Sequence, residues 1–206
     1  MYKKKPFLIV FEGVEGCGKS YQSQKLIRSL KKKGINPILT REPGGTRSAE
    51  SIRTLILKDY FNKGKEEKFD KYTDTLLYLA ARNEHIKNKI EPALKRKKVV
   101  ICDRFIDSTI AYQVYGKKVN RSFIDNIHKF ILQGIKPNLV FILKVSSKSS
   151  KLRLKKRKTR NRYDNFPQSF YTKAQKSFLK IARNKKNYFV LDSSPNNSNL
   201  EKKIFK

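Results

Sequence analysis

Cysteine is scarce in this sequence, and long apolar runs are absent from it. The only cysteines among the 206 residues are Cys17 and Cys102, which cannot build a disulfide framework and match no metal-ligand spacing. The longest apolar runs, such as Phe7–Phe11 and Leu139–Leu143, are far too short to span a bilayer. The basic start Lys3–Lys5 leads into an apolar stretch without a cleavage site, so no signal peptide is predicted. We therefore expect a reduced, cytoplasmic protein with no membrane partner.

Acidic residues are also few. The chain has 17 Asp and Glu against 49 Lys and Arg, a formal net charge of +32. Such an excess favours anionic partners, namely phosphates, nucleic acid or acidic membrane surfaces. The positive charge is spread along the chain, however, which is typical of solvated helix faces or of biased codon usage. Because the aromatic-rich motifs of RNA-binding proteins are missing as well, we expect no specific nucleic-acid partner.

No internal repeat and no linker divides the chain, and its length suits one compact domain. Short apolar runs alternate with helical patterns, which is typical of βαβ units that build a parallel sheet. The runs are apolar almost throughout, as expected for strands covered on both faces. We predict an α/β/α sandwich over 1–206 with the five parallel strands Phe7–Phe11, Pro37–Thr40, Val99–Cys102, Leu139–Leu143 and Tyr188–Leu191. Helices are predicted to begin near Gly18, Thr46, Asp74, Ser122 and Pro167.

A phosphate-binding loop follows the first predicted strand. Residues 13–20 are a complete match to G-x-x-x-x-G-K-S, placed between a strand and a helical pattern. The glycines let the backbone curl so that consecutive N–H groups point at phosphate oxygens. Lys19 would reach the β- and γ-phosphates, and the Ser20 hydroxyl would bind Mg²⁺. The pattern predicts a P-loop NTPase fold and a nucleoside triphosphate site made of Gly13, Val14, Glu15, Gly16, Cys17, Gly18, Lys19 and Ser20.

A carboxylate and an arginine follow the third predicted strand. Asp103 and Arg104 come directly after Val99–Cys102, at the edge of an open α/β sheet where ligands bind. A carboxylate in that place can hold a metal ion beside the phosphate loop, so Asp103 is a candidate Mg²⁺ ligand together with Ser20. Capping of the next helix is the alternative for Asp103. The adjacent arginine favours a site that holds both a cation and an anion.

Two further motifs complete the pattern. Residues 41–46 read Arg-Glu-Pro-Gly-Gly-Thr, and Asp103-Arg104 is followed by Ser108-Thr109 and by Ala111-Tyr112-Gln113. Together with the phosphate loop these motifs resemble the thymidylate kinase family over nearly the whole chain, whereas other nucleoside monophosphate kinases share the phosphate loop alone. The resemblance implies the reaction ATP + dTMP → ADP + dTDP with Mg²⁺, in a homodimer. Another nucleoside or nucleotide kinase, and a basic ATPase acting on nucleic acid, are the alternatives.

The same resemblance implies which residues hold dTMP. Arg53 and Arg104 would clamp its phosphate, a role that a bidentate guanidinium suits better than an ammonium group. Tyr78 would stack on thymine, one helical turn from Arg82, which would bind a base carbonyl; a core aromatic is the alternative for Tyr78. Tyr112 would fill the space that a ribose 2′-hydroxyl needs. The implied substrate residues are Glu15, Arg53, Tyr78, Arg82, Arg104, Ser108, Thr109, Tyr112 and Gln113.

The basic run Lys151–Arg162 resembles the family's lid over ATP. We expect this lid to be small and mobile and to cover about 151–166. Position 16 is Gly rather than Arg, so the resemblance implies that a lid arginine stabilises the transferred phosphoryl group. Arg157 is the first candidate and Arg153 the second. The implied catalytic set is Lys19, Arg104, Arg157 and Arg153.

Four residues depart from the family pattern or lie outside it. Asn161 stands before the lid arginine where bacterial relatives commonly have Asp, and Val114 replaces a common Gly after Tyr112-Gln113. These two departures put the closing interactions of the lid and the course of that loop in question. His85 and His128 match no catalytic position, and we expect both to be structural.

Overall fold

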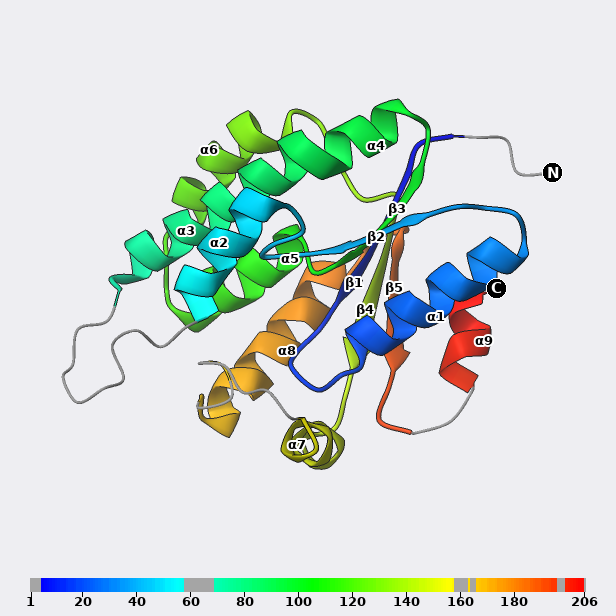
Figure 1. Ribbon diagram of the computed structural model, residues 1–206. Helices are drawn as coiled ribbons and strands as arrows, with labels where there is room; N and C mark the ends of the chain where they lie inside the picture. Colours follow the sequence, from blue (N-terminus) through cyan, green and yellow to red (C-terminus); the bar gives the residue numbers. More distant parts are fainter. Residues whose placement is uncertain (1–4, 58–68, 158–162, 164–165, 196–198, 206) are drawn as a thin grey trace.

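A five-stranded parallel sheet forms the centre of the molecule (Figure 1). The computed structural model describes residues 5–57, 69–157, 163, 166–195 and 199–205. The strands are β1 (Phe7–Glu12), β2 (Ile38–Arg41), β3 (Val99–Asp103), β4 (Leu139–Lys144) and β5 (Tyr188–Asp192), in the spatial order β2-β3-β1-β4-β5. All four neighbouring pairs are parallel. The predicted fold class is confirmed, and each predicted strand lies within one residue of its observed bounds.

The core lies along the three central strands because these are covered on both faces. Leu8 and Phe11 of β1, Ile101 of β3 and Val140 of β4 are all fully buried. A continuous apolar run is therefore required here, since a polar side chain on either face would lose its hydration. The strand β1 pairs with β3 on one side and with β4 on the other. The loop that follows β1 is consequently held at the middle of the sheet's carboxyl edge.

Helices cover both faces of the sheet (Figure 1). One face carries α1 (Lys19–Lys32) and α9 (Asn199–Phe205), which contact each other. The other face carries α4 (Glu91–Lys95), α5 (Ile106–Thr109) and α8 (Gln168–Ala182). Next to these lie α2 (Arg47–Leu57), α3 (Lys71–His85) and α6 (Arg121–Leu132). The helix α3 contacts both α2 and α6. The described part of the chain has no helix with both the length and the apolar content to cross a membrane.

Two helices widen into π-helical stretches. The helix α3 continues through η1 (Ile86–Ile90) into α4, and α5 continues into η2 (Ile110–Gly116). The predicted helix near Asp74 in fact begins at Lys71, because the Asp70 carboxylate accepts a hydrogen bond of 2.7 Å from the backbone N–H of Tyr72. The extra residue in a π-helical turn rotates the side chains that follow it, and such turns are frequent at functional sites.

The predicted lid begins with a helix. The helix α7 (Ser147–Lys155) is capped by the Ser146 hydroxyl, which accepts from the N–H of Ser149. The lid range of 151–166 thus starts inside a helix that forms four residues earlier. Residues 158–162 and 164–165 of this range, including Asn161, lie outside the described residues. The mobility of the lid stays a prediction.

Candidate active site

The phosphate-binding loop joins β1 to α1 at the carboxyl edge of the sheet. Gly13 has a φ of 138°, and a Cβ at this position would lie 2.5 Å from the carbonyl oxygen of Leu143 on β4, so only glycine lets the loop pack this closely. The Lys19 Nζ donates to the carbonyl oxygens of Gly13 at 3.1 Å and Val14 at 3.0 Å. These bonds hold the ammonium group across the loop, where an incoming phosphate can exchange for the two carbonyls.

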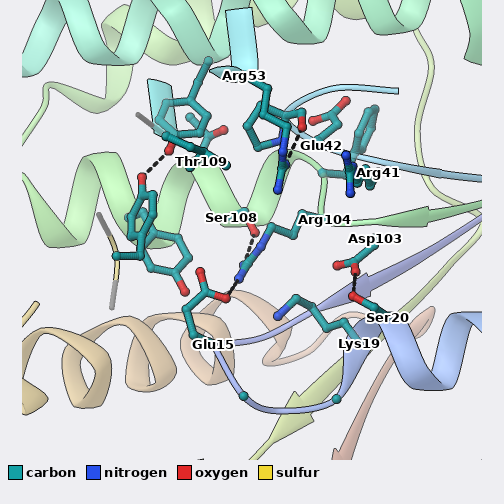
Figure 2. Close-up of a pocket in the computed structure, with 18 of the residues that line it drawn as sticks. Glu15, Lys19, Ser20, Arg41, Glu42, Arg53, Asp103, Arg104, Ser108 and Thr109 are labelled. Carbon is teal, nitrogen blue, oxygen red and sulfur yellow. Dashed lines mark hydrogen bonds and ion pairs between the residues drawn. The ribbon is translucent and has the colours of Figure 1, made fainter. Parts of the chain in front are cut away.

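Two oxygen ligands meet beside this loop. The Ser20 hydroxyl, at the start of α1, donates to Oδ2 of Asp103 at 2.5 Å (Figure 2). Hydroxyl and carboxylate oxygens are ligands that Mg²⁺ accepts beside the phosphates of a substrate. No group of three or more His, Cys, Asp or Glu side chains that could bind a metal by itself occurs among residues that the structure describes. The pair Ser20 and Asp103 therefore fits a cation shared with nucleotide phosphates.

Arg104 is held between the phosphate loop and α5. Its Nη2 donates to Oε2 of Glu15 at 2.5 Å, and its Nη1 donates to the Gly13 carbonyl at 2.9 Å and to Oγ of Ser108 at 3.1 Å. Burial alone would raise the pKa of Glu15, but the charges of Arg104 and Lys19 hold this pKa below its usual range. Glu15 is therefore an anion that fixes the Arg104 guanidinium in the cavity (Figure 2).

A second arginine reaches the cavity from α2. The Arg53 Nη1 donates to the Pro43 carbonyl at 2.6 Å, and its Nε lies 4.0 Å from Oε2 of Glu50. Glu50 also accepts from Arg41 at 3.0 Å and from the N–H of Gly45 at 2.9 Å. The loop after β2 is thereby tied to α2, and Arg53 lines the same cavity as Arg104 (Figure 2).

Arg82, on α3, is the centre of a buried hydrogen-bond network beside the cavity. Its side chain is 3% exposed, and its Nε donates to Oε2 of Glu42 at 2.7 Å. Its Nη1 donates to Thr109 Oγ1 at 2.9 Å and to His128 Nε2 at 2.8 Å. Burial and the charge of Arg82 lower the pKa of His128 to about 3, so this ring is neutral and accepts the bond. Glu42 in turn lies 3.1 Å from Nδ1 of the buried His85.

The segment α5–η2 forms one wall of the cavity. Ser108, Thr109, Tyr112 and Gln113, which the sequence placed on one helix, lie on this single helical segment, although its second half is π-helical. The Tyr112 ring is 4% exposed and packs near the ring of Phe170, with a centroid distance of 5.7 Å. The Tyr112 hydroxyl and the Gln113 Nε2 are buried without a hydrogen-bond partner in the described part of the chain. Both atoms are therefore available to a ligand or to water.

The helix α7 lies against the phosphate loop. Its Ser150 hydroxyl donates to the Glu15 carbonyl at 2.8 Å, and Nη1 of Arg153 donates to the Gly16 carbonyl at 3.2 Å. Nη2 of Arg153 also donates to the Ser193 carbonyl at 2.7 Å. Arg153 thus ties α7 to two other segments. Arg157 lines the cavity, and its charge helps to keep the pKa of Glu15 low.

These elements enclose one cavity of about 480 Å³. Its lining unites the phosphate loop, the Asp103-Arg104 pair, the α2 arginine, the α5–η2 wall and the lid helix. Of the predicted site residues, it is lined by Glu15, Gly16, Gly18, Lys19, Ser20, Arg53, Tyr78, Arg82, Asp103, Arg104, Ser108, Thr109, Tyr112, Gln113, Arg153 and Arg157. Gly13, Val14 and Cys17 are not part of the lining. They lie in the same loop, where Val14 and Cys17 are buried.

The chain that forms this cavity has relatives among known proteins. A family model described as thymidylate kinase matches residues 11–204. The thymidylate kinase of Geobacillus sp. (strain WCH70) is 41% identical over 187 residues, which cover 89% of this chain and 87% of that protein. The chain belongs to the thymidylate kinase family. The family's thymidylate kinase from Wolbachia sp. subsp. Brugia malayi (strain TRS) is 43% identical over 179 residues, which cover 85% of this chain and 81% of that one.

A solved structure of the thymidylate kinase family has the same fold. The crystal structure of thymidylate kinase from Ehrlichia chaffeensis superposes with a TM-score of 0.76 at 31% sequence identity. The match covers 98% of this chain and 97% of that one. The recognition made from the sequence motifs is therefore confirmed, while the role of each single residue stays a prediction.

Several residues of this family member's site were missed by the sequence reasoning. Arg41 is the last residue of β2 and Glu42 follows it in the same motif, yet only the structure shows that Glu42 binds Arg82 and that Arg41 lines the cavity. Tyr163 packs against Tyr112, and its hydroxyl pairs with that of Tyr78. No sequence signal pointed to these contacts, since each joins residues far apart in the chain. The other missed lining residues are Tyr21, Pro43, Leu57, Phe105, Leu154 and Lys156.

Proposed function

We propose that this chain is an ATP-dependent dTMP kinase, which transfers the γ-phosphoryl group of ATP to dTMP and releases ADP and dTDP. Membership of the thymidylate kinase family over residues 11–204 supports this reaction. The observation that carries it is one cavity shared by a phosphate-binding loop and by a separate pair of arginines, Arg53 and Arg104. Two phosphate-bearing ligands can therefore meet in one space, as phosphoryl transfer between nucleotides requires.

The donor nucleotide would be held by the phosphate loop. Lys19 gives up its two carbonyl contacts and binds the β- and γ-phosphates, and the loop N–H groups bind their oxygens. Mg²⁺, with Ser20 and Asp103 as its protein ligands, would neutralise charge on the phosphates of ATP. The attacking group is an oxygen of the dTMP phosphate, which is already an anion at neutral pH, so the chain needs no general base. Its task is to align that oxygen with the γ-phosphorus while the bond to the β-phosphate breaks.

The acceptor nucleotide would lie against α2, α3 and the α5–η2 wall. Arg53 and Arg104 would bind its phosphate, and their existing contacts restrict both guanidinium groups before the ligand arrives. Tyr78 and Arg82 face the same cavity from α3. Because Arg82 already donates to Glu42, Thr109, His128 and Phe105, a base carbonyl would share or replace one of these bonds. Nε2 of Gln113, which has no hydrogen-bond partner in the described part of the chain, would supply a further donor to the base.

The lid would supply the last positive charge. Arg153 is bound to carbonyls of the phosphate loop and of the segment after β5, which supports an anchoring role. Arg157 lies two residues beyond α7, lines the cavity and acts on Glu15 through its charge. This arrangement supports Arg157 as the group that stabilises the transferred phosphoryl.

The experiment that tests this function is a coupled ADP-release assay with dTMP, UMP, dUMP, dGMP and AMP as acceptors. We expect the highest kcat/KM with dTMP, and Lys19→Ala should abolish turnover while the circular dichroism spectrum stays unchanged. ADP release without an acceptor that rises on addition of DNA or RNA would instead favour the nucleic-acid ATPase. A preference for another monophosphate would favour a different nucleotide kinase.

We also infer a homodimer of a cytoplasmic protein. Three adjacent helices each carry an exposed apolar side chain, Leu55 on α2, Leu76 on α3 and Phe130 on α6, and Phe130 is 80% exposed. We call the solvent-exposed side of these three helices the α2–α3–α6 face, and exposed apolar side chains on it would gain from burial against a second copy. Both cysteines are unpaired and buried, which agrees with a reducing compartment.

A further inference from the structure

Glu12, the last residue of β1, is a fully buried acid next to the active-site cavity but outside its lining. Its Oε1 accepts from the backbone N–H groups of Phe105 at 2.8 Å and Ser108 at 3.1 Å. Its Oε2 lies 2.5 Å from Oγ of Ser108, which donates to it. All three donors belong to the start of α5. The carboxyl group of a residue on the central strand therefore fixes the first turn of the helix that carries the acceptor-site residues.

The Ser108 hydroxyl has a second partner. Its oxygen accepts from Nη1 of Arg104 at 3.1 Å. When the hydroxyl proton points at a Glu12 carboxylate, the oxygen turns its lone pairs to the guanidinium and becomes a stronger acceptor. Arg104 has a φ of 72°, an unfavourable conformation for a residue with a side chain. Its placement therefore depends on such surrounding bonds.

Burial raises the pKa of Glu12 to about 8, helped by the nearby Asp107 carboxylate. The bond from Ser108 and the charge of Arg104 act in the opposite direction. The ionised form is therefore stabilised by the same two groups that it holds in place.

We propose that Glu12 is a positioning residue for the acceptor phosphate: through the Ser108 hydroxyl it fixes the guanidinium of Arg104 in the cavity. The inference rests on the proposed role of Arg104 in binding dTMP. We call the chain of hydrogen bonds from Glu12 through Ser108 to Arg104 the relay. Glu12 itself contacts neither nucleotide, and the ATP-binding residues Lys19 and Ser20 are not part of the relay.

The test is a double-mutant cycle at pH 9, where Glu12 is ionised in the wild type. Glu12→Gln keeps the size of the side chain and one acceptor oxygen for the two N–H groups. Its amide, however, donates to Ser108 and leaves the hydroxyl proton without an acceptor. Ser108→Ala removes the relay atom. We expect each variant to raise the KM for dTMP about ten-fold, the effect of losing one hydrogen bond to a charged group, with the KM for ATP within two-fold of wild type.

The combination of the two changes decides the matter. If Glu12 acts through Ser108, the double variant is no worse than either single variant within two-fold. The proposal would be overturned if the effects of the two substitutions on the KM for dTMP multiply in the double variant. It would also be overturned if Glu12→Gln has wild-type kinetics, or if the KM values for dTMP and ATP rise equally. Should Glu12→Gln fail to fold, the wild type and Ser108→Ala are compared at pH 7 and pH 9, on either side of the Glu12 pKa of about 8. A KM for dTMP that falls more steeply with rising pH in the wild type than in Ser108→Ala supports the relay, and the same pH dependence in both proteins refutes it. Failure of the proposed function is visible separately, as absence of dTMP-dependent ADP release in the wild type.

Discussion

Charged side chains of the site are already paired with protein groups before a nucleotide binds. Lys19 rests on two carbonyls, Arg104 on Glu15 and Arg82 on Glu42. A guanidinium held in one geometry loses little conformational freedom when a phosphate binds. Little of the interaction free energy is therefore needed to order the side chain, and more of it contributes to the affinity for the nucleotide. Removal of a single partner leaves the other charge buried and uncompensated, which costs more than the pair itself contributes.

Arg157→Ala should lower kcat far more than it raises either KM. An interaction made only in the transition state behaves in this way, and cations that act like this contribute roughly 10³–10⁵ in rate. Arg157→Lys should recover part of the loss because it keeps the charge but not the two-pronged geometry. The matched control is Lys155→Ala, an exposed lysine of α7 that does not line the cavity. Equal, small effects of Arg157→Ala and Lys155→Ala would move the catalytic role to Arg153.

Tyr112→Ala should shift the preference between dTMP and its ribose analogue by roughly ten-fold toward the ribonucleotide. The ring is buried against Phe170 and Phe178, so its loss opens space and also costs about 3–5 kcal/mol of stability. The ratio of the two kcat/KM values is the right measurement because it does not depend on the folded fraction. Tyr112→Phe is the control, since the hydroxyl has no partner in the described structure. An unaltered ratio in Tyr112→Ala would exclude the steric role of the ring.

His128→Gln should flatten the pH dependence of stability on the acidic side. The folded-state pKa of about 3 lies below the unfolded value of about 6.5. The unfolded chain therefore takes up a proton first, and stability is lost as the pH falls from about 6.5 toward 3. At pH 5 this group alone should cost the wild type about 2 kcal/mol relative to pH 8. Urea unfolding of both proteins at pH 5 and pH 8 measures the difference, and an identical pH dependence would contradict it.

At the scale of elements, the contact between α7 and the phosphate loop depends on Gly16. A Cβ at this position would lie 2.8 Å from the Ser150 carbonyl oxygen, and φ is 71°. Gly16→Ala should therefore displace α7 and raise the KM for ATP several-fold, beyond the conformational cost of about 1 kcal/mol. Gly34→Ala is a close control because its φ is 74° and nothing lies within 4 Å of the added methyl group. A KM for ATP that is unchanged in Gly16→Ala would show that α7 tolerates the displacement.

The strands could be predicted from the sequence, whereas several features of the helices could not. Strands covered on both faces require unbroken apolar runs, so Phe7–Phe11 and Val99–Cys102 were recognisable. The helix α7 carries no buried residue, so it leaves no apolar stripe in the sequence. The π-helical turns of η1 and η2 differ from an α-helix in their backbone hydrogen bonding but not in their amino-acid composition, so the sequence does not reveal them. The role of Glu12 was also invisible, because its partners Phe105 and Ser108 lie 93 and 96 residues further along the chain.

For the whole molecule, net charge and apolar surface oppose each other. A charge of +32 repels a second copy, and salt screens this repulsion over about 10 Å at 0.1 M. We expect light scattering to show a dimer that becomes tighter as ionic strength rises. Phe130→Glu on the α2–α3–α6 face should shift the equilibrium to monomer, while Phe189→Glu, at an exposed position of β5, should not. A monomer at every salt and protein concentration would refute the dimer.

The central position of β1 also affects how the protein is made. Phe7 pairs with Val99 and Ile9 with Leu139, so β1 leaves the ribosome before either of its neighbouring strands has been synthesised. At 5–20 residues per second, the β3 partner follows only after about 5–20 s. During that time Phe7–Phe11 is an uncharged, β-prone run, and an unpaired strand of this kind is exposed to pairing with other chains. Lys3–Lys5 before the run and Glu12 after it place charges at both ends, as gatekeeper residues do. Glu12 would thus protect the chain from aggregation during synthesis, before it becomes buried in the folded protein.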